Sequence, residues 1–170
     1  MFAFSFMTLH RAGKEVKYLK LSTKGRYGLR AVLDIAVHGQ EEAVALSSTS
    51  EREGISISYL EQLVSKLKKA GILNSIRGAQ GGYVLARPAR EISVGDVLRS
   101  LEGSLSPVEC GELDGEEGCS AAKSCVTKYV WKKISDSINE TVDAITIAEL
   151  VKESHCQNRE QKEKNVRCSG

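Results

Sequence analysis

One segment constrains the fold more than any other: a strongly amphipathic helix pattern followed at once by a glycine-rich hairpin. Within residues 58–70 the apolar side chains recur at helical spacing and share one face. They are Leu60, Leu63, Val64 and Leu67. Gly71 ends the pattern, as glycine commonly does after a helix. Two short apolar runs, 72–76 and 83–86, then flank the glycine-rich residues 78–82, which predicts two antiparallel strands joined by a tight turn.

Helical patterns lie on both sides of this segment. Residues 26–38 carry an apolar stripe, and residues 47–53 form a short polar helix pattern for which Ser47 or Ser48 is the expected N-cap. A further pattern runs from Ser93, its expected cap, to Leu101. A helix, a short helix, a tight turn, a third helix and then a two-stranded hairpin predict a winged helix-turn-helix domain, which with the helix at 93–101 covers residues 19–102. The expected fold class is mainly α with a small β wing, followed by a long dimerisation helix.

The outward face of the helix at 58–70 carries residues suited to DNA. We expect this face to present Ser58, Tyr59, Glu61, Gln62 and Lys66. A helix in the major groove reads bases with its first residues, where Gln62 can bond adenine and Glu61 can accept from cytosine N4. Glu61 has a second interpretation, because Ser58 and Glu61 have the spacing of a capping box. Both interpretations are open at the level of sequence.

Cations elsewhere suit the DNA backbone. Arg77 lies beside Gly78 in the predicted wing, where an arginine can enter the minor groove or clamp a phosphate. Lys24 and Arg26 open the first long helix and are expected to reach phosphates. Residues 1–100 hold 15 Lys and Arg against 9 Asp and Glu, an excess of +6, whereas the remainder carries −4. A basic front half favours a polyanionic partner.

Cysteines are confined to the second half of the chain. Cys110, Cys119 and Cys125 lie in or just after a glycine-rich acidic loop, 103–121. An odd number of cysteines in a reducing compartment indicates metal or redox chemistry rather than disulfides. The chain lacks the short knuckle of structural zinc sites, and wide spacing on a flexible loop suits a larger body such as an iron–sulfur cluster. Unligated reduced thiols are the alternative.

A coiled-coil-like seam follows the cysteines. Over the expected helix 122–146, apolar residues alternate at steps of three and four, which predicts dimerisation. The seam residues are Trp131, Ile134, Ile138 and Ile145, with Thr141 between the last two. We expect a short helix up to residue 152, a disordered tail over 153–170, and a leader at 1–18 that is disordered or not native. Because no apolar stretch is long enough to cross a membrane, we expect a cytoplasmic protein.

Three ordered stretches closely resemble the IscR-type iron–sulfur cluster regulator family of bacterial transcription factors. They are KLSTKGRYG (20–28), GISISYLEQL (54–63) and RGAQGGY (77–83), and the likeness continues through CVTKYVW (125–131) and ITIAEL (145–150). The resemblance covers about residues 19–152 and implies a homodimer that binds a palindromic promoter site in double-stranded DNA. It further implies a cluster on the three cysteines, with [2Fe–2S] favoured over [4Fe–4S], and control of genes for cluster assembly.

Departures from the family pattern leave the fourth cluster ligand open. Lys128 stands where some members place a histidine ligand, and Arg26 stands where others take an aspartate from the partner. The remaining candidates are Glu112, His155 or Cys156, or a small molecule. In addition, Thr49 occupies a position that is usually apolar, and we expect its methyl group to face inward in a locally weak helix.

Two alternatives stand beside a cluster sensor. The first is a thiol- or zinc-responsive winged-helix regulator, for example of cysteine metabolism, without a cluster. The second is a module that docks to a metabolic enzyme. An enzyme is not expected, because the three histidines belong to no visible triad and the sequence has no phosphate loop or dinucleotide fingerprint.

Overall fold

The computed structural model describes residues 22–40, 42–78, 80–108 and 124–167. The expected leader and two of the three clustered cysteines, Cys110 and Cys119, lie outside these residues. In chain order the elements are α1 (Thr23–His38), α2 (Leu46–Glu53), α3 (Ile57–Lys69), β1 (Leu73–Ile76), β2 (Gly82–Leu85), the 3-10 turn η1 (Ala89–Glu91), α4 (Val94–Glu102), α5 (Lys128–Ala144) and α6 (Ile147–Arg167).

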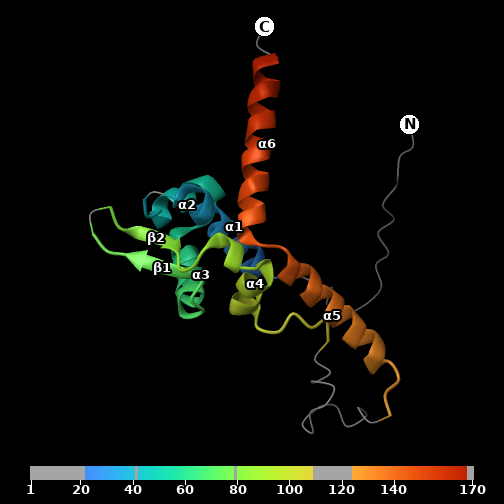
Figure 1. Ribbon diagram of the computed structural model, residues 1–170. Coiled ribbons are helices and arrows are strands. Elements are labelled where there is room, and N and C mark those ends of the chain that lie inside the picture. Colours follow the sequence, from blue (N-terminus) through green and yellow to red (C-terminus); the bar gives the residue numbers. More distant parts are fainter. Residues whose placement is uncertain (1–21, 41, 79, 109–123, 168–170) are drawn as a thin grey trace, which may run out of the picture.

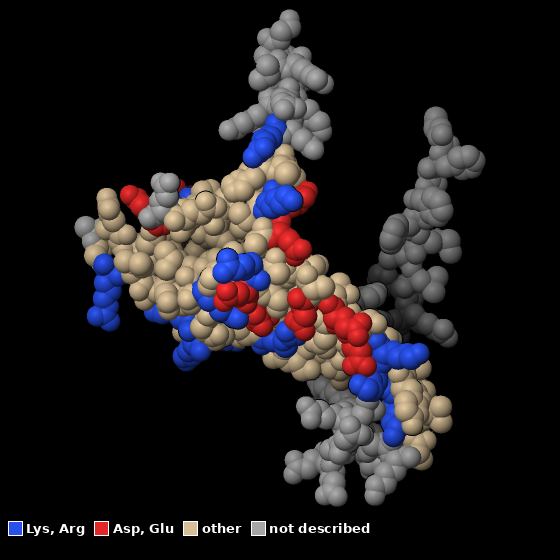
Figure 2. All heavy atoms as spheres, viewed as in Figure 1, with Lys and Arg blue, Asp and Glu red and all other residues tan. Residues whose placement is uncertain are grey.

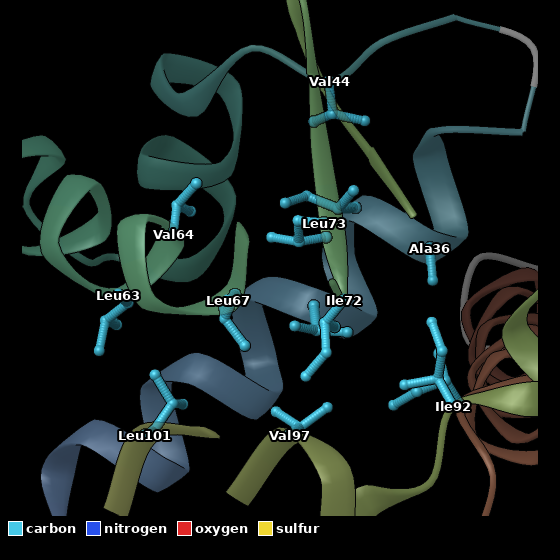
Figure 3. Packing of buried hydrophobic residues seen from close by; sticks show 13 residues of the cluster. Ala36, Val44, Leu63, Val64, Leu67, Ile72, Leu73, Ile92, Val97 and Leu101 are labelled. Atoms are coloured by element: carbon cyan, nitrogen blue, oxygen red, sulfur yellow. The ribbon is translucent and has the colours of Figure 1, made fainter. Parts of the chain in front are cut away.

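Helices α1, α3 and α4 enclose one hydrophobic core, and the hairpin β1–β2 leaves it as a wing (Figure 1). The core brings together apolar side chains from every one of these elements (Figure 3). They include Val32, Ile35, Leu63, Val64, Leu67, Ile72, Leu73, Ile92, Val97, Leu101 and Ile147. The predicted buried face of the helix at 58–70 is confirmed in full, and so is the mainly α fold with a small β wing.

The wing is a two-stranded antiparallel sheet with a third, single-residue partner. Leu73 pairs with Leu85 and Ile76 with Gly82, and Val44 bridges to Tyr83 through two backbone bonds of 3.0 and 2.9 Å. A Cβ added at Gly82 would lie 2.5 Å from the Val44 oxygen. Glycine is therefore required for the connection between α1 and α2 to join the edge of the wing.

Helix caps differ from prediction at α3 and agree at α4. The expected capping box of Ser58 and Glu61 is wrong, because α3 begins at Ile57 and Ser58 is already inside it. Ser56 is the N-cap, and its carbonyl accepts the amides of Tyr59 and Leu60 at 3.1 and 3.0 Å. At α4 the expected cap Ser93 is confirmed, and it forms a capping box with Asp96.

Helix α2 is joined to α1 by a buried polar contact. It begins at Leu46 after Ala45, so neither Ser47 nor Ser48 is its N-cap. Thr49 is fully buried, and its hydroxyl donates to Asp34 Oδ2 at 2.7 Å. The buried threonine thus supplies a hydrogen bond as well as the expected methyl group.

The two C-terminal helices also depart from prediction. Helix α5 was expected from residue 122 but begins at Lys128, since residues 124–127 form a turn. Helix α6 was expected to end near residue 152 but continues to Arg167, in place of the expected disordered tail. Its start is fixed reciprocally, because Glu149 accepts the Thr146 amide at 2.7 Å and Thr146 Oγ1 accepts the Glu149 amide at 3.2 Å. Among the described residues, none of these helices combines the length and apolar character of a membrane span.

Candidate nucleic-acid interface and cysteine site

The first turns of α3 present three of the predicted base-reading side chains to solvent. Ser58, Glu61 and Gln62 are exposed, on the side of α3 opposite the core. Because the capping box is not formed, Glu61 is left with its base-reading interpretation. Lys66, one turn further along, directs its Nζ to within 3.4 Å of the Leu101 carbonyl of α4.

Tyr59 differs from its neighbours because its ring packs inside the domain. The side chain is half-buried and meets Tyr27 of α1 edge to face, with ring centroids 6.1 Å apart. The Arg30 guanidinium lies 5.6 Å from the centre of the Tyr27 ring. Sequence reasoning placed Tyr59 wholly on the outward face, whereas the structure uses its ring to join α1 to the start of α3.

The wing presents Arg77 where β1 gives way to the turn. Arg77 is exposed, and the following Gly78 has a φ of 133°, which is open to glycine but strained for other residues. A second cation, Lys68, ties the wing to α3: its Nζ donates to Ser75 Oγ at 2.8 Å and lies 5.9 Å from the Tyr83 ring. Lys and Arg side chains project from the wing and from α3 in Figure 2, whereas α5 carries acidic side chains toward the winged domain and Lys side chains at its far end.

A buried carboxylate holds α2, the helix preceding α3, against α1. Arg52 donates to Asp34 through Nε at 2.6 Å and through a second guanidinium nitrogen at 2.8 Å, while Thr49 supplies a third bond. Burial opposes ionisation of Asp34, but the bonds from Arg52 and Thr49 outweigh it and lower the pKa of this carboxyl group. The sequence analysis missed this buried ion pair. A carboxylate inside an apolar helix pattern, such as Asp34, is a detectable sign of a buried ion pair.

A second ion pair joins the C-terminal end of α2 to α1. Arg30 donates from Nε to Glu53 Oε2 at 2.6 Å and from its terminal nitrogen to the Glu53 carbonyl at 2.8 Å. Arg30 and Asp34 are one turn apart on α1, and Arg52 and Glu53 are adjacent on α2. The orientation of α2, and with it the turn into α3, is therefore set by α1.

Cys125 is the member of the predicted cysteine site that the structure describes. It is a free thiol, half-exposed, in the turn before α5. Its Sγ lies 3.1 Å from Thr127 Oγ1, and this bond, with help from the Lys128 and Thr127 backbone amides, lowers the pKa of the thiol. A thiol biased toward thiolate is the form that binds iron. Whether Cys110 and Cys119 join it lies outside the described residues, which hold no group of three candidate metal ligands.

The candidates for the fourth ligand are widely distributed. Lys128 is occupied elsewhere, since its Nζ lies 5.4 Å from the centre of the Tyr129 ring. His155 and Cys156 are exposed on α6, and Arg26 is exposed on α1. Glu112 lies outside the described residues. The described part of the chain thus assigns no fourth ligand.

Helix α5 carries the predicted dimerisation residues on an open apolar face. Trp131, Ile134 and, just beyond the helix, Ile145 each retain 37% exposure, and Ile138 is half-buried. None of the 17 residues of α5 is buried in the single protomer, and the helix leaves the winged domain at one end (Figure 1). A seam of this kind is complete only when another surface covers it.

Comparisons with known proteins agree with this arrangement. Residues 21–153 match the family model described as "Rrf2: Iron-dependent Transcriptional regulator". The HTH-type transcriptional regulator IscR of Serratia proteamaculans is 45% identical over 133 residues, which are 78% of this chain and 79% of that protein. The IscR of Aliivibrio salmonicida is 44% identical over 139 residues, 82% and 81% of the two chains.

Two solved structures are similar in fold and sequence. T. potens IscR superposes with a TM-score of 0.64 at 48% identity, covering 79% of this chain and 88% of that one. CymR (YrzC), described as the global cysteine regulator of B. subtilis, superposes with a TM-score of 0.66 at 41% identity, covering 80% and 98% of the two chains.

Proposed function

Because the chain belongs to the Rrf2 family of iron-dependent transcriptional regulators, we propose that it acts as a homodimer that senses iron–sulfur cluster status and controls genes of cluster assembly. That it is a DNA-binding transcription regulator rather than an enzyme follows from the family and from its relatives. The observation that carries the sensing role is the position of Cys125. This free thiol with a lowered pKa directly precedes the helix whose apolar face is uncovered.

Cys110, Cys119 and Cys125 are the residues that would hold the cluster, with [2Fe–2S] favoured over [4Fe–4S]. A bound cluster supplies redox-active iron on thiolate ligands. The protein's own contribution is a thiol at Cys125 whose pKa is lowered by the Thr127 hydroxyl, 3.1 Å from the sulfur. Since Cys125 lies three residues before Lys128, the first residue of α5, a change at this sulfur acts at the base of the proposed dimer helix.

Reading of DNA is assigned to α3 and the wing. Gln62 would bond adenine and Glu61 would accept from cytosine N4 in the major groove, since both are exposed near the start of α3. Exposed Ser58, in the same first turns of α3, and Tyr59 are proposed as further DNA contacts. Arg77 would enter the minor groove or clamp a phosphate, and Lys66 would support the backbone contact.

Dimerisation through α5 would present two α3 helices to one operator. The seam residues Trp131, Ile134, Ile138 and Ile145 are the surface proposed to pair with a second copy. Half-sites read by a two-fold dimer lie about one helical turn, roughly 34 Å, apart. A palindromic promoter site follows from that symmetry.

The first test is the content of iron and acid-labile sulfide in protein purified without oxygen. We expect about two of each per monomer for a [2Fe–2S] cluster, with loss of both in Cys125→Ala. Cys168→Ala is the matched control, because Cys168 is a cysteine that belongs to neither the three proposed ligands nor the candidates for the fourth, and its iron content should stay unchanged. A cluster signal that survives in Cys125→Ala would remove this cysteine from the ligand set.

A thiol- or zinc-responsive regulator without a cluster is the second candidate. The similarity to the cysteine regulator CymR favours it, and the exposed thiol of Cys125 serves it equally well. Colourless protein that binds one zinc, or whose DNA affinity changes on mild thiol oxidation, would establish this alternative. Absence of saturable binding to any promoter DNA would instead favour a module that docks to an enzyme.

A further inference from the structure

The first turn of α1 places positive charge where a helix normally avoids it. Lys24 and Arg26 are exposed there, and the turn contains no acidic residue. Because the amino end of a helix dipole is positive, cations in the first turn are unfavourable and anions favourable. Two cations in this position indicate that they serve an anionic partner rather than the helix itself.

The carboxylate that compensates them comes from another helix. Glu102, the last residue of α4, accepts the backbone amide of Gly25 at 2.8 Å through Oε1. The same oxygen accepts the Ser22 hydroxyl, and Ser22 Oγ in turn accepts the Lys24 amide at 3.1 Å. In an ordinary capping box the hydroxyl of the N-cap residue accepts the amide of the third helical residue. Here Ser22 is the N-cap, and the amide of the third helical residue, Gly25, is accepted instead by a carboxylate 77 positions away.

The contact between these two helices depends on the absence of a side chain at Gly25. A Cβ added there would lie 2.8 Å from Glu102 Oε1 and 3.1 Å from a Leu98 methyl carbon. Both atoms are ends of side chains, so a methyl group at position 25 would displace the Glu102 carboxylate from the amide that it accepts. The carboxylate therefore reaches the amide because the two helices touch at this glycine.

The capped turn lies next to the reading helix. Tyr27, one turn beyond Lys24, contacts Tyr59 in the first turns of α3. The cations of α1 and the proposed base-reading residues of α3 therefore lie in the first turns of two helices that contact each other. Any shift in the first turn of α1 changes where Lys24 and Arg26 stand relative to DNA bound along α3.

We infer that Glu102 is a positioning residue for DNA binding: it holds the first turn of α1 so that Lys24 and Arg26 contact phosphates. It acts through these two cations and touches no DNA itself. The inference rests on the DNA-binding function and adds to it a residue that stands outside the helix-turn-helix and the wing.

The negative charge of Glu102 and the hydrogen bonds by which it caps α1 have opposite effects on DNA affinity, so variants can separate them. Its negative charge repels phosphates, so removal of charge alone should strengthen binding slightly. Loss of the cap frees the first turn of α1 and should weaken binding. Glu102→Gln removes the charge but keeps an oxygen that can accept both bonds, whereas Glu102→Ala removes both.

The test measures the affinity of each full-length variant for a duplex that the wild-type protein selects from randomised DNA, over a range of salt concentrations. We expect Glu102→Ala to bind about fivefold more weakly than Glu102→Gln, the size of one lost helix cap. The slope of log affinity against log salt concentration should fall for Glu102→Ala toward that of the Lys24→Ala, Arg26→Ala double variant. Each phosphate contact that is lost lowers the size of this slope by about 0.9. Glu91→Ala is the charge-matched control, since Glu91 is exposed and pairs with Arg90 rather than with α1.

A cycle with the double variant distinguishes positioning from general stability. In the background of Lys24→Ala and Arg26→Ala, Glu102→Ala should cause no further loss relative to Glu102→Gln. Equal affinities of the Ala and Gln variants, or the same loss in both backgrounds, would overturn the inference. Wild-type protein that selects no DNA would instead contradict the DNA-binding function itself, so the two failures are distinguishable.

Discussion

Two surfaces of this protein differ in composition and in how far the protomer covers them. One is the contact between α1 and α2, and the other is the exposed face of α5. The first is polar, yet it is closed: the Asp34 side chain is 2% exposed and has partners for both oxygens. The second is apolar, yet Trp131 and Ile134 remain 37% exposed. Residue type alone would have assigned the apolar face to the core and the carboxylate to the surface. One region is therefore complete within the protomer, whereas the other leaves an apolar face that we propose a second copy covers.

The largest expected effect concerns the unfinished region. Ile138→Glu would place one charge from each protomer in the proposed dimer seam, where an unpaired charge is costly to bury. We expect dimer affinity to fall by about 100-fold or more, equivalent to at least 2.7 kcal/mol, with helix content unchanged. Sedimentation velocity over a range of concentrations measures this shift.

Lys133→Glu is the control for the seam. It changes charge by a larger amount at an exposed position of the same helix, outside the apolar stripe. Its dimer affinity should stay within a few fold of wild type. If both variants dissociate equally, the apolar stripe is not the interface and the comparison between the two regions fails.

A comparable loss of folding stability is expected in the finished region. Asp34→Asn should lower the free energy of unfolding by about 2 kcal/mol, because it weakens the charge-assisted bonds that Arg52, itself about a third exposed, makes to a buried carboxylate. Urea denaturation monitored by circular dichroism gives the value. Asp136→Asn removes an exposed ion pair with Lys132 and should cost about 0.5 kcal/mol or less. Similar losses for both variants would show that burial of Asp34 is not what matters.

The pH dependence of stability sharpens the same point. The pKa of Asp34 is lowered in the folded protein, so its stabilising contribution is present above the unfolded pKa of about 3.9 and is lost as pH falls through the lower folded value. Wild-type protein should therefore lose stability more steeply than Asp34→Asn as pH falls below about 4. Denaturation midpoints from pH 2 to 6 measure the slopes, and parallel curves would contradict the assignment.

The smallest expected effect lies where α4 of the winged domain meets α5. Arg99 of α4 donates to Asn139 of α5 at 2.9 Å and pairs with Asp143. Both charged side chains are about a third or more exposed, so Arg99→Ala should cost only about 0.5–1 kcal/mol of stability. Since this contact fixes the direction of α5, we expect a larger loss of affinity for paired half-sites than for a single one. Equal losses on the two DNAs would show that Arg99 does not set the dimer geometry.

Local pattern was enough to predict several parts of this protein. The apolar face of α3, the glycine-rich wing and the cap at Ser93 all follow from spacing along a few turns, and so does the apolar stripe of α5 at Trp131 and Ile134, whose dimer role stays a prediction. The cysteine spacing and the family resemblance provide the cluster hypothesis in the same way. Each of these features depends on residues close in the chain, and helical or strand periodicity records such neighbours directly.

The predictions were wrong where one local sequence pattern is compatible with more than one structure. Ser58 and Glu61 have capping-box spacing, but Ser56 begins the helix two residues earlier. The charged stretch after residue 152 was expected to be disordered, yet α6 continues through it from a start fixed by Thr146 and Glu149. Polar composition did not distinguish a solvated helix from a disordered tail, because both keep their side chains in water.

Contacts between distant residues were decided only by the tertiary structure. The sequence pattern singled out Tyr59 but neither Asp34 nor Glu102. It could not show that Asp34 is buried against Arg52, that Glu102 caps α1 or that Tyr59 packs on Tyr27. These pairs are separated by 18, 77 and 32 positions, and each forms because packing of the apolar core brings two helices together. Local spacing determines which face of a helix is apolar, whereas the partner of a polar group depends on which other helix that face is packed against.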